Sequence, residues 1–206
     1  MFTAQELAEL TREALSTTHP DDLAYLAVTG KIELPVRDAL GALMTRKFPE
    51  LTAAREFKRR DLAILRDGVP LAVIEGKLWI SFEANVPSKL NNPNPKEGLL
   101  AAAMSDIKKM NDLHQTTGCE RFTSTVLFGA DIRQLETRHL PAIKYPHWHH
   151  RGLANNVGLE VAHSAGIDRY VEATTPMGSC AVARLFEGTA FGMPVLADVI
   201  ICKVSD

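Results

Sequence analysis

The sequence predicts an α/β fold, with a central mixed sheet flanked by helices and a β-hairpin at the C-terminal end. Three observations lead to this prediction. Apolar residues recur at helical spacing through residues 3–48, two branched apolar runs surround an Asp-Gly turn signal within residues 61–77, and a helical pattern over 95–118 precedes a strand-like run at 121–130. Helices and strands that succeed one another in this way pack as layers of an α/β fold.

Composition sets mild limits on the function. The chain has 206 residues, of which 46% are hydrophobic and 23% charged, as in ordinary globular proteins. The formal net charge of -2 gives no global attraction to nucleic acid, so any basic surface must be local. No apolar run approaches the roughly 18 residues of a membrane helix, and no signal peptide is evident. Three cysteines, Cys119, Cys180 and Cys202, lack metal or redox spacing, which predicts free thiols and a cytoplasmic location.

Three helices are predicted before residue 50. Residues 3–15 begin with a capping box formed by Thr3 and Glu6. A second short helix within 18–30 starts near a proline and closes at a glycine, and residues 35–48 carry a further apolar stripe with a proline in the first turn.

Residues 61–77, DLAILRDGVPLAVIEGK, predict a β-hairpin. The segments 62–65 and 70–77 are apolar and rich in branched side chains, and the Asp-Gly pair between them is a turn signal. With a three-residue loop, Asp61 lies directly opposite Glu75. A two-residue loop would shift the pairing by one residue and carry the carboxylates to opposite faces.

The hairpin brings together charged groups with a chemical use. Two converging carboxylates, Asp61 and Glu75, repel each other, so they need protonation or a cation. Mg²⁺ fits best because it takes oxygen ligands and keeps several waters, with Mn²⁺ as a substitute. Lys77, on the same face as Glu75, would orient an attacking water or offset charge on a phosphate. In the alternative interpretation Asp61 pairs with Arg59 or Arg60, and Glu75 pairs with Lys77, on a solvated surface.

The pattern of Asp61, thirteen intervening residues and Glu75-x-Lys77 resembles the signature of the PD-(D/E)xK nuclease superfamily. The proline of that signature is absent, and Arg60 precedes Asp61. The resemblance implies the restriction-endonuclease-like fold, whose αβββαβ core would cover residues 33–130, and it implies that Asp61, Glu75 and Lys77 are the catalytic residues.

In the same superfamily an acidic residue from the helix before the hairpin often joins the metal site. Glu33 is the candidate here, as a metal ligand beside Asp61 and Glu75, with Asp38 behind it. The alternative is that Glu33 or Asp38 complements the dipole of the helix near whose start it lies.

A basic run leads into the hairpin. Residues 51–60 hold Arg55, Lys58, Arg59 and Arg60 against a single glutamate. Beside a phosphodiesterase site these side chains would bind the phosphate backbone of nucleic acid, whereas in the alternative interpretation they form a solvated face.

Past the hairpin, asparagines and prolines over 91–95 mark an exposed loop. The helix of 95–118 carries a broad apolar stripe, with Asp106 and Lys109 expected on its polar side, and the strand at 121–130 follows. This succession of strand, hairpin, helix and strand resembles the αβββαβ core.

The last third offers fewer signals. Residues 144–150, KYPHWHH, cluster His147, His149 and His150 around Trp148. Clustered imidazoles can bind zinc, but the compressed spacing favours an exposed loop, and a basic and aromatic patch that contacts DNA is a further alternative. A short helix is predicted at 156–166, followed by a terminal hairpin with strands near 180–187 and 193–204 that either extends the central sheet or forms a small second one.

With the resemblance, the sequence predicts a Mg²⁺-dependent endonuclease, with DNA as substrate because the superfamily works mostly on DNA. The alternative is a non-catalytic module that keeps the nuclease fold to bind nucleic acid or protein. We expect one domain over residues 1–206, in which 131–206 extends the core and completes the sheet. A homodimer is expected because cutting both strands of a duplex calls for two sites.

Overall fold

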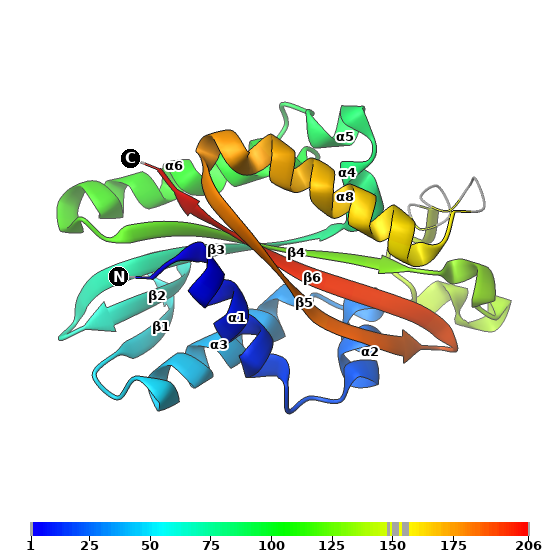
Figure 1. The fold of residues 1–206 in the computed structure, drawn as a ribbon, viewed down its shortest axis with the longest axis horizontal. Helices are drawn as coiled ribbons and strands as arrows, with labels where there is room; N and C mark the ends of the chain where they lie inside the picture. The colour runs from blue at the N-terminus through cyan, green and yellow to red at the C-terminus, as the bar shows by residue number, and fades with distance from the viewer. Residues whose placement is uncertain (1, 148, 150–152, 154–156, 206) are drawn as a thin grey trace.

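A six-stranded mixed sheet lies between two layers of helices in the computed structural model, which describes residues 2–147, 149, 153 and 157–205 (Figure 1). The strands stand in the order β1-β2-β3-β4-β6-β5, and within this sheet the β3–β4 pair is parallel while the other pairs are antiparallel. The prediction of an α/β fold with a mixed sheet and a C-terminal hairpin is confirmed.

The C-terminal hairpin extends the central sheet, because its second strand pairs with the fourth strand of the core. The order of elements also contains the expected αβββαβ succession, as α3, β1, β2, β3, α6 and β4. The six strands are β1 (Thr52–Phe57), β2 (Arg60–Arg66), β3 (Val69–Ile80), β4 (Glu120–Ala130), β5 (Gly178–Ala190) and β6 (Met193–Val204).

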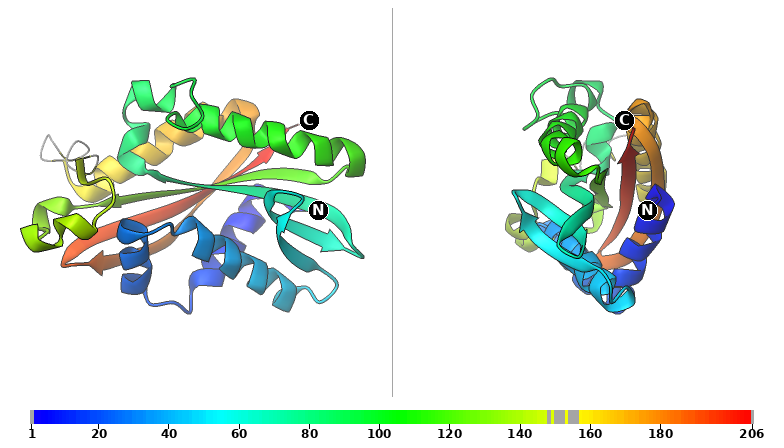
Figure 2. Two further views of the ribbon diagram at one scale, coloured as in Figure 1. Left: turned by 180° about the vertical axis from the view of Figure 1, so that it is seen from behind. Right: turned by 90° about the vertical axis from the view of Figure 1, so that its left-hand side faces the viewer.

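Two groups of helices cover the two faces of the sheet (Figure 2). The first group packs against β1, β2, β5 and β6 and consists of α1 (Ala4–Leu15), α2 (Pro20–Thr29) and α3 (Glu33–Lys47). The second group lies across β3, β4 and β6 and consists of α4 (Ser81–Ala84), α5 (Pro87–Leu90), α6 (Leu99–Thr117) and α8 (Leu159–Thr174). Short 3-10 turns occupy Ile132–Gln134, Thr137–Ala142 and Thr175–Met177.

Local sequence signals explain most helix ends. Thr3 and Glu6 form the predicted capping box of α1, and Gly118, in the left-handed region at φ 68°, ends α6. The predicted starts were less accurate, because α3 begins at Glu33 and α6 at Leu99. Helix α8 is longer than predicted and runs to Thr174, and α4 and α5 were not predicted.

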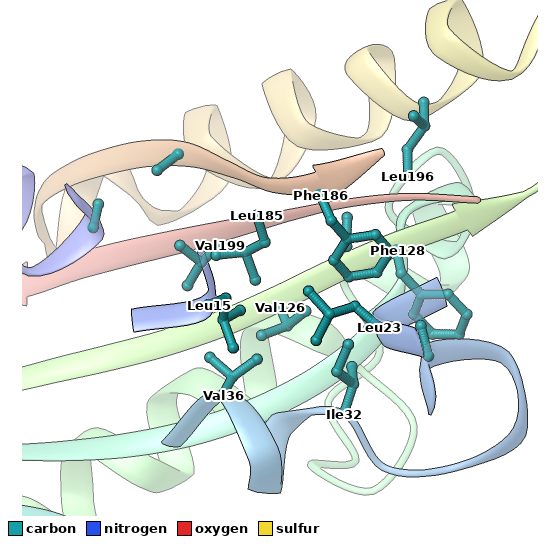
Figure 3. Close-up of a cluster of buried hydrophobic side chains, with 14 of the residues drawn as sticks. Leu15, Leu23, Ile32, Val36, Val126, Phe128, Leu185, Phe186, Leu196 and Val199 are labelled. Carbon is teal, nitrogen blue, oxygen red and sulfur yellow. The ribbon is translucent and has the colours of Figure 1, made fainter. Parts of the chain in front are cut away.

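The main core lies between the sheet and helices α1 to α3 (Figure 3). Branched side chains from the three helices meet Val126 and Phe128 of β4 and apolar residues of the C-terminal hairpin. The residues labelled in Figure 3 are all buried: Leu15, Leu23, Ile32, Val36, Val126, Phe128, Leu185, Phe186, Leu196 and Val199. This packing fixes α3 against β2 and β3, where the candidate site lies.

The prediction of three free thiols is wrong for two of the cysteines. Cys180 and Cys202 face each other across β5 and β6 and form a disulfide with an S–S distance of 2.09 Å, while Cys119 is free and buried. They are 22 positions apart in the sequence, and the pairing of the strands brings them together. Among the helices of the described part of the chain, none has the length and hydropathy that crossing a bilayer requires.

Candidate functional site

The hairpin of β2 and β3 has the register that brings Asp61 toward Glu75, but it reaches that register by an unpredicted route. Its turn contains two residues, Asp67 and Gly68, both with positive φ, so the expected three-residue loop is wrong. A bulge near Ile64 inserts one extra residue in β3 and restores the pairing of Leu62 with Ile74. One step further, this register would set Asp61 opposite Glu75, but Leu62 and Ile74 are the last pair of the ladder.

The two strands separate at the candidate site. Beyond the Leu62–Ile74 pair, Asp61 Oδ2 accepts a hydrogen bond of 2.7 Å from the backbone N–H of Gly76. The Asp61 carboxylate thus accepts a hydrogen bond from β3 at the point where a backbone carbonyl of a paired strand would accept one. This bond holds the side chain against β3. From this point to Ile80, the strand that pairs with β3 in the described residues is β4 alone, so the other edge of β3 has no strand beside it.

Glu75 is a buried carboxylate with incomplete hydrogen bonding. Its residue is 3% exposed, and its Oε1 has no hydrogen-bond partner among the described residues. Its Oε2 lies 3.9 Å from the ammonium of Lys109. Burial, together with the charges of Asp61 and Asp106, raises the pKa of Glu75 to about 7. At neutral pH this side chain therefore divides between its protonated and ionised forms.

Lys77 and Lys109 are joined to the site by Asp106 of α6. Asp106 Oδ2 lies 2.8 Å from Lys77 Nζ, and its Oδ1 lies 2.6 Å from Lys109 Nζ. The Asp106 side chain is 2% exposed, whereas those of Lys77 and Lys109 are 33% and 47% exposed. Partial burial lowers the pKa of Lys109, but the hydrogen bond to Asp106 and the charges of Asp106 and Glu75 outweigh it, so that the pKa is raised. Lys109 therefore stays charged, and both lysines remain open to solvent.

Glu33 and Asp38, the two candidates for a third acidic ligand, have different surroundings. Glu33 lines a small cavity of about 20 Å³ together with Asp61, and its buried Oε2 has no hydrogen-bond partner among the described residues. Asp38 instead forms ion pairs of 2.9 and 2.8 Å with Arg37 and Arg55. Glu33 is therefore the acidic residue of α3 that remains available beside Asp61.

The described residues do not bring three potential ligands together as a preformed metal centre. No group of three or more His, Cys, Asp or Glu side chains in this part of the chain is arranged to hold an ion. Of the predicted trio, Asp61 and Glu33 line one small cavity and the charge of Asp61 acts on Glu75, but the three side chains are not gathered around one point. Two carboxylates, Asp61 and Glu75, remain as the core of the candidate site.

The basic run divides into paired and open side chains. Arg55 is engaged with Asp38, and a guanidinium nitrogen of Arg60 donates to the backbone carbonyl of Lys109. Lys58 and Arg59 form the exposed turn between β1 and β2, both with positive φ. The structure therefore leaves Lys58 and Arg59 better placed for phosphate contacts than Arg55 and Arg60.

Asp106 and Lys109 are the site residues that sequence reasoning missed. The prediction placed both on the polar side of the helix, which is wrong for Asp106 because it is buried against β3. A signal was present: Asp106 falls at helical spacing between Ala103 and Met110, both of which are buried. A charged residue within an apolar stripe needs partners, and two lysines supply them.

The histidine run has a mainly structural role where the structure describes it. His149 is fully buried, accepts a 3.3 Å hydrogen bond from the backbone N–H of Ala130, and packs against Phe82 and Phe128. The prediction of an exposed loop is therefore wrong for His149. His147 is exposed, while Trp148, His150 and residues 151 and 154–156 lie outside the described residues.

A second buried polar group, which we call the Ser-His-Asp row, joins Ser81, His163 and Asp198. His163 Nδ1 lies 2.8 Å from Ser81 Oγ, and His163 Nε2 lies 2.7 Å from Asp198 Oδ2. Ser81 and His163 are fully buried, and a Cβ added at Gly129 would lie only 3.0 Å from Ser81 Oγ. Asp198 also accepts a hydrogen bond of 2.8 Å from Arg184. Despite its chemical resemblance to a catalytic triad, this packed row leaves no room for a substrate at the serine.

The β2–β3 edge thus combines two carboxylates, a third acidic residue in a cavity beside them, and two solvent-accessible lysines. Such a combination can hold a cation and stabilise an anion at the same place. Comparison with protein-family models, with curated proteins and with solved structures found no match to this chain.

Proposed function

We propose that this chain is a metal-dependent nuclease that hydrolyses phosphodiester bonds of DNA, with Asp61, Glu75 and Lys77 as its catalytic residues. The observation that carries the proposal is the state of Glu75, a carboxylate 3% exposed with an unpartnered oxygen and a second carboxylate beside it. A buried carboxylate with an unpartnered oxygen is costly, so its retention at the edge of the sheet supports a role in binding a cation.

The residues of the site fit a hard divalent cation. Asp61 and Glu75 would hold Mg²⁺, or Mn²⁺ in its place, while Glu33 lines the small cavity beside Asp61 and is not gathered with both carboxylates around one point. Two carboxylates are enough, because Mg²⁺ usually keeps several waters. When bound, the ion would supply Lewis-acid stabilisation of the charge that develops on a phosphoryl group.

The lysines have a separate role in the proposal. Lys77 lies two residues beyond Glu75 on the same face of β3, and its partly exposed ammonium would stabilise negative charge on a phosphate or orient the attacking water. Asp106 positions Lys77 and Lys109 from behind and does not itself face the substrate in this proposal. Lys58 and Arg59, exposed on the β1–β2 turn, would bind the phosphate backbone beyond the scissile bond.

A non-catalytic nucleic-acid-binding module is the second candidate, and one observation favours it. The Lys77 ammonium is 2.8 Å from Asp106, so part of its charge is already neutralised within the protein. In this alternative the acidic groups and lysines would form a stable ion-pair network, and divalent cations would not change the behaviour of the protein.

The test is a cleavage assay on supercoiled plasmid, single-stranded DNA and RNA with Mg²⁺ or Mn²⁺, paired with calorimetric titration of Mn²⁺. We expect wild-type protein to cleave DNA and expect D61N and E75Q to lose at least about a hundredfold in rate and to lose the Mn²⁺ binding signal. The matched control is D67N, in the exposed turn of the same hairpin, because asparagine also tolerates positive φ.

The results separate the two candidates. Cleavage that disappears in D61N and E75Q but survives in D67N supports the nuclease. Absence of cleavage on every substrate, with Mn²⁺ titrations that do not differ between wild type and D61N, would exclude it. DNA binding that persists under those conditions would then support the binding module.

A further inference from the structure

A cavity of about 320 Å³ lies beside the end of β3, close to the proposed catalytic residues. Its walls include Leu78, Trp79 and Ile80, which follow Lys77 directly along the strand. Because a strand rises about 3.3 Å per residue, this wall begins only about 3 Å beyond Lys77 and ends about 10 Å beyond it. The volume falls in the range of cavities that bind small molecules.

The cavity is rich in positive charge. Lys89 of α5, Lys96 of the following loop and Lys144 after the 3-10 turns all line it, although they come from separate parts of the chain. Lys144 Nζ donates a hydrogen bond of 3.2 Å to the Gly30 carbonyl, which leaves two of its three N–H groups for other acceptors. We call this cavity, with its three lysines, the lysine pocket.

Glu83 is the acidic residue among those that line the lysine pocket. It is 7% exposed, and its Oε2 accepts a hydrogen bond of 3.4 Å from the backbone N–H of Ile80. Burial raises the pKa of Glu83, although the hydrogen bond from Ile80 and the charge of Lys89 oppose the rise. Three ammonium groups line the pocket, and burial disfavours the charged form of its one carboxyl group. The pocket therefore favours an anionic ligand.

Two aromatic side chains complete the lysine pocket. Trp79 lines one wall, and its buried indole N–H has no hydrogen-bond partner among the described residues. Tyr145 lines another part and is 60% exposed, at a backbone φ of 55° that non-glycine residues adopt rarely. Aromatic rings provide a stacking surface for bases.

We propose that the lysine pocket binds a nucleotide of the substrate strand that flanks the scissile phosphate, with its phosphate on Lys89, Lys96 and Lys144 and its base against Trp79 or Tyr145. As a substrate subsite it rests on the proposed nuclease function. The open edge of β3 links the pocket to Asp61 and Glu75, and its extent beyond Lys77 matches the axial rise of about one to three nucleotides. An acidic peptide would match the charge but would leave the aromatic surface unexplained.

The test measures binding without cleavage. The chain contains two tryptophans, so in a W148F background Trp79 is the sole tryptophan reporter of the pocket. The probe is a 5′-phosphorylated deoxydinucleotide titrated in EDTA, with inorganic phosphate and the unphosphorylated nucleoside as comparison ligands. We expect saturable quenching by the dinucleotide and much weaker binding of either comparison ligand.

Variants locate the binding site. We expect K96A and K144A each to weaken dinucleotide binding about tenfold, because each removes a charge-assisted contact, and Y145A to weaken it less. The matched control is K47A, whose lysine pairs with Glu13 on the surface of α3 and lies outside the pocket. K96A and K144A should also raise the KM for plasmid cleavage more than they lower kcat.

Each outcome has a separate meaning. Equal affinity for inorganic phosphate and dinucleotide would overturn the nucleotide assignment, and so would K96A and K144A variants that bind like K47A. If the wild type cleaves DNA while these variants bind and cleave normally, the pocket proposal fails and the nuclease proposal stands. If the dinucleotide binds as expected but no nucleic acid is cleaved, the nuclease proposal fails while nucleotide binding by the pocket is supported.

Discussion

Two buried polar groups in this protein differ in how completely their atoms are paired. In the Ser-His-Asp row, both ring nitrogens of His163 have close partners, and Asp198 also binds Arg184. At the β2–β3 edge, Glu75 is equally buried but has an oxygen without a partner. The residue types of the row suggest catalysis more strongly, yet its geometry indicates a structural role.

The difference shows that accessibility and unmet hydrogen bonding point to function better than residue type. The row joins α4, α8 and β6 and has no space beside its serine. The β2–β3 edge has exposed lysines, two unpartnered carboxylate oxygens and an adjoining cavity. A satisfied buried network stabilises a fold, whereas an unsatisfied one requires a ligand or a proton.

The largest expected effect is on the stability contributed by the row. D198A removes the carboxylate that binds His163 and Arg184, so we expect the free energy of unfolding to fall by roughly 3 to 5 kcal/mol. Urea denaturation measures this change. The control is D168N on the exposed face of α8, which should change stability by less than about 0.5 kcal/mol. A loss below about 1 kcal/mol in D198A would contradict the structural role of the row.

The next effect concerns Glu75 and pH in the absence of divalent cations. Its pKa is raised from 4.5 to about 7 in the folded protein, so between these values the folded state retains a proton that the unfolded state releases. The contribution of Glu75 to the free energy of unfolding should therefore fall as pH rises from 4.5 through 7, by roughly 3 kcal/mol in total. E75Q should lack this decline, and E187Q, an exposed control, should keep it. Identical pH profiles for wild type and E75Q would disprove the coupling.

Divalent cations should stabilise the protein through Asp61 and Glu75 at the β2–β3 edge and not through the Ser-His-Asp row. At a concentration of about one hundred times its Kd, Mg²⁺ should stabilise wild-type protein by about 2.7 kcal/mol, seen as a rise in Tm. D61N and E75Q should lose this increment, whereas D198A should retain it despite its lower starting stability. An increment that survives in E75Q would place the cation elsewhere.

The smallest effect distinguishes the row from a catalytic triad. S81A removes one hydrogen bond to His163, so we expect a loss of about 1 kcal/mol in stability. Because Ser81 is fully buried, neither ester hydrolysis nor DNA cleavage should change beyond what S88A, an exposed serine control in α5, produces. An esterase activity that S81A alone abolishes would reverse the assignment of the two groups.

Local patterns predicted much of the architecture. The capping box at Thr3, the Asp-Gly turn at residues 67–68 and the glycine end of α6 are short-range features whose cause lies within a few residues. The register that brings Asp61 toward Glu75 was expected for an incomplete reason, because a bulge rather than a longer turn produces it. A bulge depends on how β2 and β3 pack against the helices and leaves no clear mark in the sequence.

Contacts between distant segments were beyond prediction from the sequence. Asp106 joins the site because α6 packs its stripe on β3, and Cys180 meets Cys202 because β5 and β6 pair in one particular register. The lysine pocket likewise draws Lys89, Lys96 and Lys144 from three segments. Such proximity depends on the packing of the whole fold rather than on local propensity.

The sequence by itself determined most of the helices and strands and the spacing of Asp61, Glu75 and Lys77, because these depend on periodicity and turn chemistry within short segments. Tertiary structure alone decided that the polar atoms of the Ser-His-Asp row are hydrogen-bonded, whereas the β2–β3 edge has unpartnered carboxylate oxygens. That distinction depends on whether side chains far apart in the sequence reach each other in the fold, as His163 reaches Ser81 and Asp198 while Glu75 Oε1 meets no partner among the described residues.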